Sequence, residues 1–250
     1  MIKLIASDLD GTLLPYGSSA ISATAKKLIY QALDTGISFA VSSGRTYRQL
    51  VSLLPEFEND IYFIADDGAY CVKSGKVLYS KHIDKEELSR VTSVGASLLP
   101  CVLHGAFKDY FLGDIPKEYT QDFITRENAG IFPYDGSDRI YKITSFSPLK
   151  RLPLYSKLRL HWNDGENKAF AQYVNRFSNK GAALSDLKIR LLLSGLDTAV
   201  IGDMDNDIPM MRGAKYAYAI GDRSKGLAAV ATHTAETAEC ALASILAKAK

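Results

Sequence analysis

Short apolar runs alternate with amphipathic segments along the first quarter of the chain. The apolar runs predict buried strands, and the segments between them have the periodicity of helices. Ser22 is a suitable N-cap for the first helix, and Gly36 ends it. The expected strands are 2–7, 37–42 and 61–65, and the expected helices are 22–35 and 46–54. This order is typical of right-handed crossovers in a parallel sheet, so the expected fold class is α/β with a Rossmann-like core.

The pattern changes after Asp67 and returns near residue 177. A hairpin is expected over 69–72 and 76–79, followed by a helix over 85–99 and strands over 101–107, 110–112, 140–146 and 158–162. The parallel rhythm resumes with a helix over 180–193, strands over 198–201 and 216–220, a short helix between them and a terminal helix over 236–248. We therefore expect a discontinuous core, residues 1–82 and 177–250, with an inserted α+β domain over 83–176.

Composition narrows the class of protein. The 250 residues include 30 Lys and Arg against 28 Asp and Glu, with no block of like charge, so nucleic-acid and membrane-surface binding are not expected. The three cysteines lack the spacing of a zinc site and fit free thiols. No signal peptide and no apolar run long enough to span a bilayer is recognised. The expectation is a cytoplasmic protein, whose oligomeric state the sequence does not reveal.

Candidate chemistry begins where the first strand ends. Asp8 and Asp10 stand two positions apart, so they are expected to point to one side and converge at the carboxyl end of the strand, where open α/β sheets bind ligands. Crowded carboxylates persist around a cation or a shared proton. Asp8 is therefore a candidate nucleophile for phosphoryl transfer, and Asp10 is a candidate acid and base. An Asx turn or a helix cap is the plainer alternative.

Three further groups follow later strands or begin helices. Ser42-Ser43-Gly44-Arg45 offers a hydroxyl and backbone N–H groups to an anion, although Ser-Ser-Gly before a helix is more often plain helix capping. Lys180 begins a helix and is a candidate for neutralising a carboxylate and a phosphoryl oxygen, although a lysine taken alone is more often a solvated surface residue. The loop 202–207 (Gly-Asp-Met-Asp-Asn-Asp) supplies oxygen ligands suited to Mg²⁺. A calcium EF-hand is excluded, because Ile208 and Ala214 occupy its sixth and twelfth positions, where glycine and glutamate are required.

In this order the four groups resemble the haloacid dehalogenase (HAD) superfamily of phosphohydrolases, specifically its Cof-type members of subclass IIB. The resemblance covers both core segments and is one of position and length only over the inserted domain. It implies a Mg²⁺-dependent phosphatase that acts on small phosphorylated metabolites, with sugar phosphates as the leading class. The inserted domain would be a cap that closes over the site and selects the substrate.

The resemblance also implies roles for individual residues. Asp8 would be the nucleophile, Asp10 the general acid and base, and Lys180 the third catalytic residue. Mg²⁺ would be held by Asp8, Asp203 and the backbone carbonyl of Asp10, with Asp207 supporting Lys180 or the metal shell. The residues expected to bind substrate are Leu9, Ser43, Gly44, Arg45, Lys180 and Asn206. One departure bears on specificity: family members often carry Asn-Gly after the third strand, where this chain has Asp67-Gly68.

Two alternatives remain open. A phosphomutase of the same superfamily, resembling phosphomannomutase, would return the phosphoryl group to another hydroxyl. A receiver-like or phosphometabolite-sensing module would bind without turnover, but a receiver is about half this length and a binding module has no need of Asp10.

Overall fold

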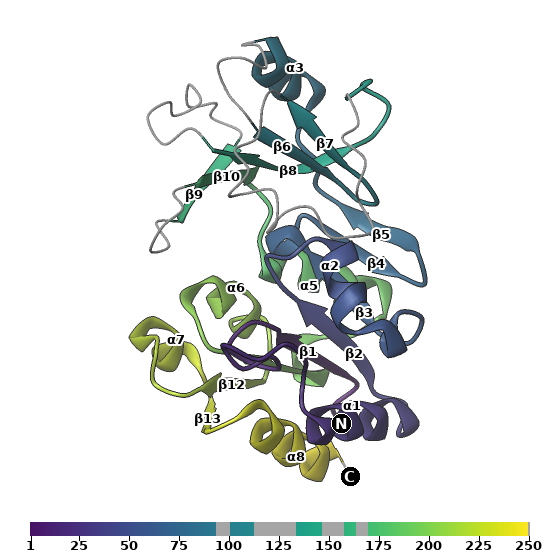
Figure 1. The fold of residues 1–250 in the computed structure, drawn as a ribbon. Helices are drawn as coiled ribbons and strands as arrows, with labels where there is room; N and C mark the ends of the chain where they lie inside the picture. The colour runs from purple at the N-terminus through teal and green to yellow at the C-terminus, as the bar shows by residue number, and fades with distance from the viewer. Residues whose placement is uncertain (94–100, 113–133, 147–157, 164–169, 250) are drawn as a thin grey trace. The chain divides into compact units, whose positions relative to one another are not determined.

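A computed structural model describes residues 1–93, 101–112, 134–146, 158–163 and 170–249. They form two compact units (Figure 1): the core unit, Met1–Ser80 with Asn179–Lys250, and the inserted unit, Lys81–Ser178. The expected boundaries, after residues 82 and 176, lie within a few residues of these.

The core unit is built on an eight-stranded sheet with the order β13-β12-β11-β1-β2-β3-β4-β5. Its strands are β1 (Leu4–Asp8), β2 (Ser38–Ser42), β3 (Tyr62–Ala65), β4 (Tyr70–Lys73), β5 (Lys76–Ser80), β11 (Thr198–Gly202), β12 (Tyr216–Ile220) and β13 (His233–Ala235). Strands β13 to β3 are parallel, and β4 and β5 continue the sheet as an antiparallel hairpin. The central position of β1 brings the carboxyl ends of β11, β1 and β2 side by side.

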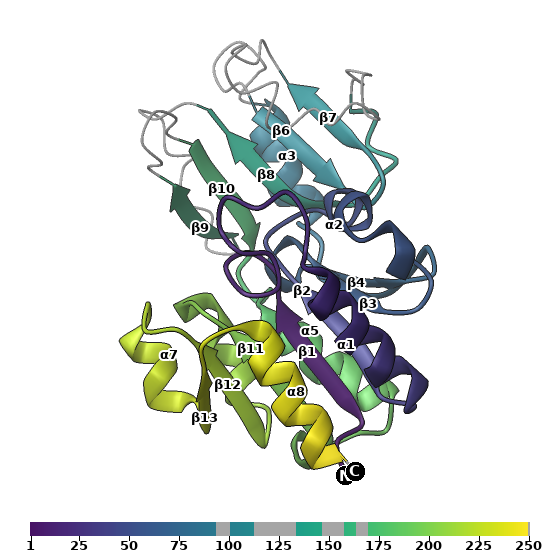
Figure 2. The same cartoon turned by 60° about the horizontal axis from the view of Figure 1, so that its bottom comes forward.

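Helices cover both faces of this sheet (Figure 2). They are α1 (Ala23–Asp34), α2 (Tyr47–Leu53), α5 (Lys180–Arg190), α6 (Ile208–Met211), α7 (Lys225–Val230) and α8 (Ala238–Ala249). Single turns of 3₁₀ helix lie at η1 (Pro55–Phe57), η2 (Asp66–Gly68), η4 (Gly195–Asp197) and η5 (Asp205–Asp207). Helices α1 and α8 pack together on one face, and α5 packs against α6. Leu4 and Ala6 of β1 share a buried apolar cluster with Leu184 and Leu187 of α5, which fixes α5 on the sheet.

The inserted unit is an antiparallel sheet with the order β7-β6-β8-β10-β9, accompanied by α3 (Lys85–Ser93). Its strands are β6 (Cys101–Gly105), β7 (Asp109–Leu112), β8 (Ile140–Ser145), β9 (Leu158–Asn163) and β10 (Phe170–Asn175). Leu88 of α3 packs with Leu103, Ile143 and Tyr173, so one face of the sheet forms the apolar core of the unit. The unit is thus α+β, as the sequence pattern predicts.

The α/β class with a parallel-sheet core is confirmed, but three elements were not expected: α7, β13 and β10. Strand β10 was missed because its alternation is weak. Ala171 and Tyr173 face the apolar core, yet Val174 on the other side is buried as well. Of the helix expected over 85–99, the structure describes α3 to Ser93, and the remainder lies outside the described residues.

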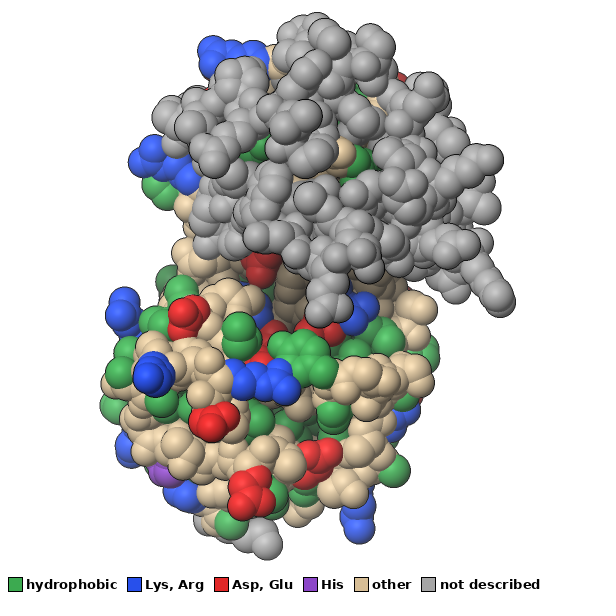
Figure 3. All heavy atoms as spheres, turned by 60° about the vertical axis from the view of Figure 1, so that its left-hand side comes forward, with side chains coloured by type: hydrophobic (Ala, Val, Ile, Leu, Met, Phe, Trp, Pro, Cys, Tyr) green, Lys and Arg blue, Asp and Glu red, His purple; other side chains and the backbone are tan. Residues whose placement is uncertain are grey.

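Charge is distributed without a dominant sign. The face of the core unit in Figure 3 carries basic and acidic side chains interspersed with apolar ones. This agrees with the small formal net charge of +2. Among the helices that the structure describes, none has the length and apolar character needed to cross a membrane.

Candidate active site

Asp8 is the last residue of β1 and is almost completely buried. Lys180, the first residue of α5, donates a hydrogen bond from Nζ to Asp8 Oδ1 at 2.5 Å and to Asp207 Oδ1 at 2.7 Å. Asn179 caps α5 by accepting a hydrogen bond from the N–H of Ala182 at 2.8 Å, so the helix start that carries Lys180 is itself fixed. The ammonium group therefore lies between two carboxylates, one from the end of β1 and one from the segment after β11.

The charge of Lys180 is secured by its neighbours. Burial disfavours the protonated amine, but the carboxylates of Asp8, Asp207 and Asp67 outweigh this effect and raise the pKa of Lys180 above its usual range. Lys180 is thus a fixed positive charge at a buried position, which is the requirement for stabilising charge on a phosphoryl oxygen.

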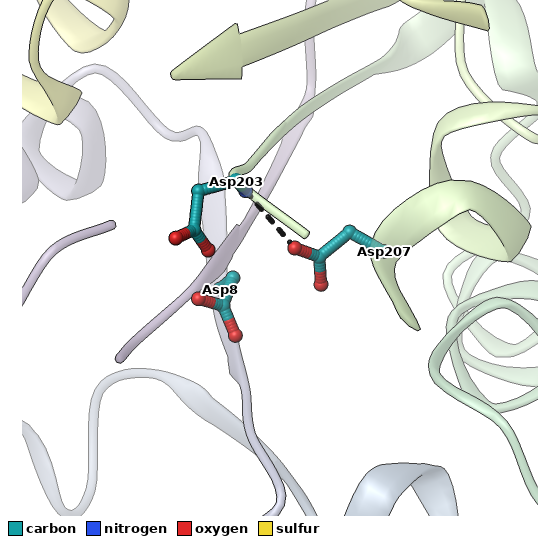
Figure 4. Close-up of side chains that lie close together, drawn as sticks. All are labelled: Asp8, Asp203 and Asp207. Atoms are coloured by element: carbon teal, nitrogen blue, oxygen red, sulfur yellow. Dashed lines mark hydrogen bonds between the residues drawn. The ribbon is translucent and has the colours of Figure 1, made fainter. Parts of the chain in front are cut away.

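Asp207 is fully engaged in organising this loop. Its Oδ1 accepts from Lys180, and its Oδ2 accepts from the backbone N–H groups of Asp203 at 3.0 Å and Met204 at 3.2 Å. Figure 4 shows the bond between Asp207 and the backbone of Asp203. Gly202 permits this approach, because a Cβ at that position would lie 2.5 Å from Asp207 Oδ2. Asp207 therefore positions both Lys180 and Asp203.

Asp203 follows β11 and is buried beside Asp8 (Figure 4). Thr12 donates to its Oδ1 at 3.3 Å, and the hydroxyl of Tyr16 donates to its Oδ2 at 3.4 Å. Arg223 lies 3.7 Å from the same Oδ2 and stacks over the ring of Tyr16. Burial and the charge of Asp207 raise the pKa of Asp203.

The site fits a divalent cation. Carboxylate oxygens of Asp8, Asp203 and Asp207 all lie within 4.8 Å of one another. Asp8 Oδ2 is buried and receives no hydrogen bond from the described residues, which leaves a strong acceptor without a donor. Burial, reinforced by the nearby charges of Asp207 and Asp203, raises the pKa of Asp8 to about 7 despite Lys180. An oxygen-rich, crowded acidic site with one orphaned oxygen is suited to Mg²⁺.

Asp10 lies outside the cluster of three carboxylates and has its own hydrogen-bond partners. Arg45 donates from Nε to both carboxylate oxygens of Asp10, at 2.9 and 3.0 Å, and from Nη2 to Oδ1 at 2.7 Å. The Ser43 hydroxyl donates to Asp10 Oδ2 at 3.0 Å. Strand β1 ends at Asp8, so Asp10 lies beyond the region in which side chains alternate regularly.

The loop after β2 offers fewer free backbone donors than expected. The N–H of Ser43 donates to the carbonyl of Ile64 at 3.0 Å, and the N–H of Arg45 donates to the Ser43 hydroxyl at 3.1 Å. Thr46 is the N-cap of α2, in a capping box with Gln49, so the serines are not the cap. The Ser43 and Arg45 side chains therefore hold Asp10, and these two residues border the site mainly through their side chains.

Leu9 and Asn206, two of the residues expected to bind substrate, take no part in the contacts of the carboxylate cluster among the described residues. Leu9 is completely buried, and its carbonyl accepts from the N–H groups of Thr12 and Leu14 in the turn after β1. Asn206 lies in η5 and is exposed, with no side-chain hydrogen bond among the described residues. The Leu9 side chain therefore has no exposed surface to offer a substrate, whereas the Asn206 side chain is open to solvent.

Sequence reasoning missed Tyr16 and Arg223, which contact the cluster from the loops after β1 and β12. The only sequence feature that could have indicated them is position, because both residues follow parallel strands at the carboxyl edge of the sheet, where ligands bind. Thr12, two positions after Asp10, also contacts the cluster and had no role assigned from the sequence.

Proteins of similar sequence and fold are known. A family model described as haloacid dehalogenase-like hydrolase matches residues 5–243. The chain is 26% identical to the 5-amino-6-(5-phospho-D-ribitylamino)uracil phosphatase YbjI of Escherichia coli, over 94% of this chain and 90% of that protein. It is 28% identical to the HMP-PP phosphatase of Yersinia enterocolitica, over 84% and 81%. A solved subclass IIB sugar phosphatase has the same fold, with a TM-score of 0.72 at 20% identity over 93% of this chain and 92% of its own.

Proposed function

Because the chain belongs to the haloacid dehalogenase-like hydrolase family and is a phosphatase of that family, we propose that it hydrolyses sugar phosphates with Mg²⁺ through an aspartyl-phosphate. The observation that carries the proposal is the arrangement around Asp8. One of its oxygens accepts a hydrogen bond from Lys180, and the other is buried and receives none from the described residues. The carboxylate as a whole lies close to that of Asp203.

Asp8 is the proposed nucleophile. Its carboxylate oxygen attacks phosphorus, so that a bond from Asp8 to phosphorus forms and the bond from phosphorus to the leaving oxygen breaks. Asp10 donates a proton to that leaving oxygen. Asp10 then takes a proton from the attacking water, whose oxygen displaces Asp8 and releases phosphate.

Asp10 is suited to this exchange because it is oriented without being buried. Its side chain is 36% exposed, and the bidentate contact with Arg45 together with the Ser43 hydroxyl limits its rotation. A proton carrier must be held near the reacting oxygens and still reach water. The exposure of Asp10 meets the second condition, and its proposed position beside the leaving oxygen would meet the first.

Asp8, Asp203 and the Asp10 carbonyl would hold Mg²⁺, with Asp207 supporting Lys180 and the loop of Asp203. Both oxygens of Asp207 accept hydrogen bonds of 2.7 to 3.2 Å from Lys180 and from two backbone N–H groups, whereas those that Asp203 accepts are longer, at 3.3 and 3.4 Å. This favours Asp8 and Asp203 as the carboxylate ligands. When bound, Mg²⁺ supplies positive charge that neutralises the phosphoryl oxygens. Lys180, Ser43, Gly44, Arg45 and Asn206 are the proposed contacts to substrate, with Leu9 contributing only through its backbone.

The substrate class rests on the relatives. The name of the Escherichia coli relative places its phosphate on a ribityl chain, and the subclass IIB neighbour is a sugar phosphatase. On that basis we propose a polyol or sugar monophosphate as the substrate of this chain. The three cysteines are free thiols, which supports the proposal that the reaction takes place in the cytoplasm.

The test is phosphate release from an aryl phosphate and from a panel of sugar phosphates, with Mg²⁺ and with a chelator. We expect turnover with the metal and none with the chelator. Asp8→Asn, which keeps the shape of the side chain, should lower turnover by about a thousandfold or more. Asp34→Asn makes the same change at an exposed site at the end of α1 and should leave turnover unchanged.

Full turnover by Asp8→Asn would refute the proposed nucleophile. Isomerised sugar phosphate without free phosphate would instead identify a mutase.

A further inference from the structure

The turn after β3 has an unusual backbone. Asp66, Asp67 and Gly68 are three successive residues in the left-handed region, with φ of 48°, 55° and 85°. This region disfavours side chains in general, and Asp and Asn are among the residues that tolerate it best. A run of this kind persists only where the surroundings fix it.

Two contacts of the turn fix it against the loop after β2. The N–H of Asp66 donates to the carbonyl of Arg45 at 2.9 Å, and the N–H of Asp67 donates to the carbonyl of Ser43 at 3.0 Å. On its other side the turn meets the start of α5, where a Cβ on Gly68 would lie 2.2 Å from the carbonyl oxygen of Asn179. The turn is therefore wedged between the Ser43–Arg45 loop and the helix that carries Lys180.

This placement brings the carboxylate of Asp67 to the phosphoryl-binding residues. A Cβ on Gly44 would lie 3.3 Å from Asp67 Oδ2 and 3.4 Å from Oδ1. The charge of Asp67 also contributes to raising the pKa of Lys180. The side chain is half-buried, and no hydrogen bond reaches its carboxylate from the residues that the structure describes. Among the described residues, the carboxylate oxygens of Asp67 therefore lie beside the site and accept no hydrogen bond from the protein.

A carboxylate in this position discriminates between substrates. It accepts hydrogen bonds and donates none, so it favours a hydroxyl or an amine and disfavours a second anionic group. Lys180 and the proposed Mg²⁺ neutralise the phosphoryl group itself, and the charge of Asp67 therefore acts mainly on the part of the substrate attached to it.

We infer that Asp67 is a specificity-determining residue that selects monophosphates of polyols or amino sugars over phosphorylated acids and diphosphates. This inference rests on the proposed phosphatase function and narrows its substrate class.

The test compares two probes that differ at one carbon: glycerol 3-phosphate, which carries a terminal hydroxyl, and 3-phosphoglycerate, which carries a carboxylate there. Each is measured as a substrate and as an inhibitor of aryl phosphate hydrolysis, so that a ratio is obtained even where neither is turned over. The wild type should prefer glycerol 3-phosphate. In Asp67→Asn the preference should fall by about tenfold, since the repulsion is removed and one amide donor is gained.

Two further variants complete the design. Asp34→Asn removes one negative charge far from the carboxyl edge of the sheet and should keep the wild-type ratio. Asp67→Gly removes the carboxylate and accepts a φ of 55°, so it replaces Asp67→Asn if the latter does not fold.

The outcomes separate the inference from the proposed function. An unchanged probe ratio in a folded Asp67 variant would overturn the role of Asp67, while hydrolysis of the aryl phosphate would keep the phosphatase. If the wild type released no phosphate from any monoester with Mg²⁺, the proposed function itself would fail.

Discussion

Asp8 has to lose its proton before it can bind a metal or attack phosphorus. Burial raises its pKa to about 7, so in the metal-free protein the proton competes with Mg²⁺ near neutrality. We predict that the apparent affinity for Mg²⁺, measured by calorimetry, falls as the pH is lowered from 8 to 6, by up to about tenfold per unit below the pKa. An affinity that is independent of pH over this range would contradict the assignment of Asp8 as a ligand.

The raised pKa of Asp8 also determines whether its contribution to the free energy of unfolding increases or decreases with pH. Between pH 4 and 7 the native state keeps a proton on Asp8 that the unfolded chain has already lost, since the ordinary pKa of Asp is 3.8. The contribution of Asp8 to the free energy of unfolding of the metal-free protein therefore decreases as the pH rises through this window.

Arg45 gives a second prediction, because it holds Asp10 in two places. We expect Arg45→Gln to lower kcat by about tenfold to a hundredfold, since Asp10 would lose its orientation for proton transfer. Mg²⁺ affinity should change much less, because the Arg45 side chain holds Asp10 and, among the described residues, not Asp8 or Asp203. Arg212→Gln, at an exposed site, is the matched control. Wild-type kcat in Arg45→Gln would exclude this positioning role.

For single residues, position after a strand was sufficient to predict that Asp8, Asp203 and Asp207 lie together. Lys180 begins a helix and was assigned only together with the other motifs, since one lysine among many carries no signal of its own. Asp8, Lys180, Asp203 and Asp207 do lie in contact. The side-chain direction of Asp10 was not predictable, since it depends on where β1 ends and on the bonds that Arg45 makes. Tyr16 and Arg223 were missed because a loop residue has no periodicity to reveal its direction.

Among the elements, the η2 turn and the start of α5 control the position of Lys180. Gly68→Ala should be strongly destabilising, by about 3 kcal/mol or more, because the new Cβ would meet the backbone of Asn179 at a φ of 85°. Gly75→Ala, at a φ of 70° but in open space, should cost only about 1 kcal/mol. The midpoints of thermal unfolding measure the difference. Equal losses in the two variants would show that the close contact at Gly68 carries no energy.

The sequence pattern was sufficient to predict some of the strands and not others. The strands of the parallel sheet are continuous apolar runs buried on both faces, and such runs are distinctive. Strand β13 has three residues and β10 has a weak alternation, so neither produced a signal. Their pairing with β12 and with β8 and β9 depends on partners distant in the chain.

For the whole molecule, the division into two compact units predicts which part of the chain Mg²⁺ stabilises. Every proposed ligand belongs to the core unit, so Mg²⁺ should stabilise that unit directly. In hydrogen exchange, we expect Mg²⁺ to increase protection in the segments after β1 and β11 and to leave the amides of β6 and β8 unchanged. A metal-dependent change of similar size in β6 and β8 would show that the inserted unit contributes to the ion site.

The central claim is that Asp8 becomes covalently phosphorylated, and it is tested most directly by mapping the phosphoryl group. Wild type and Asp10→Asn are mixed with Mg²⁺ and substrate, quenched in acid during turnover, digested and analysed by mass spectrometry. We predict that the peptide containing Asp8 gains the mass of one phosphoryl group, and that it accumulates further in Asp10→Asn because the second step lacks its base. Continued turnover with no phosphorylation of Asp8 in either protein would contradict the account.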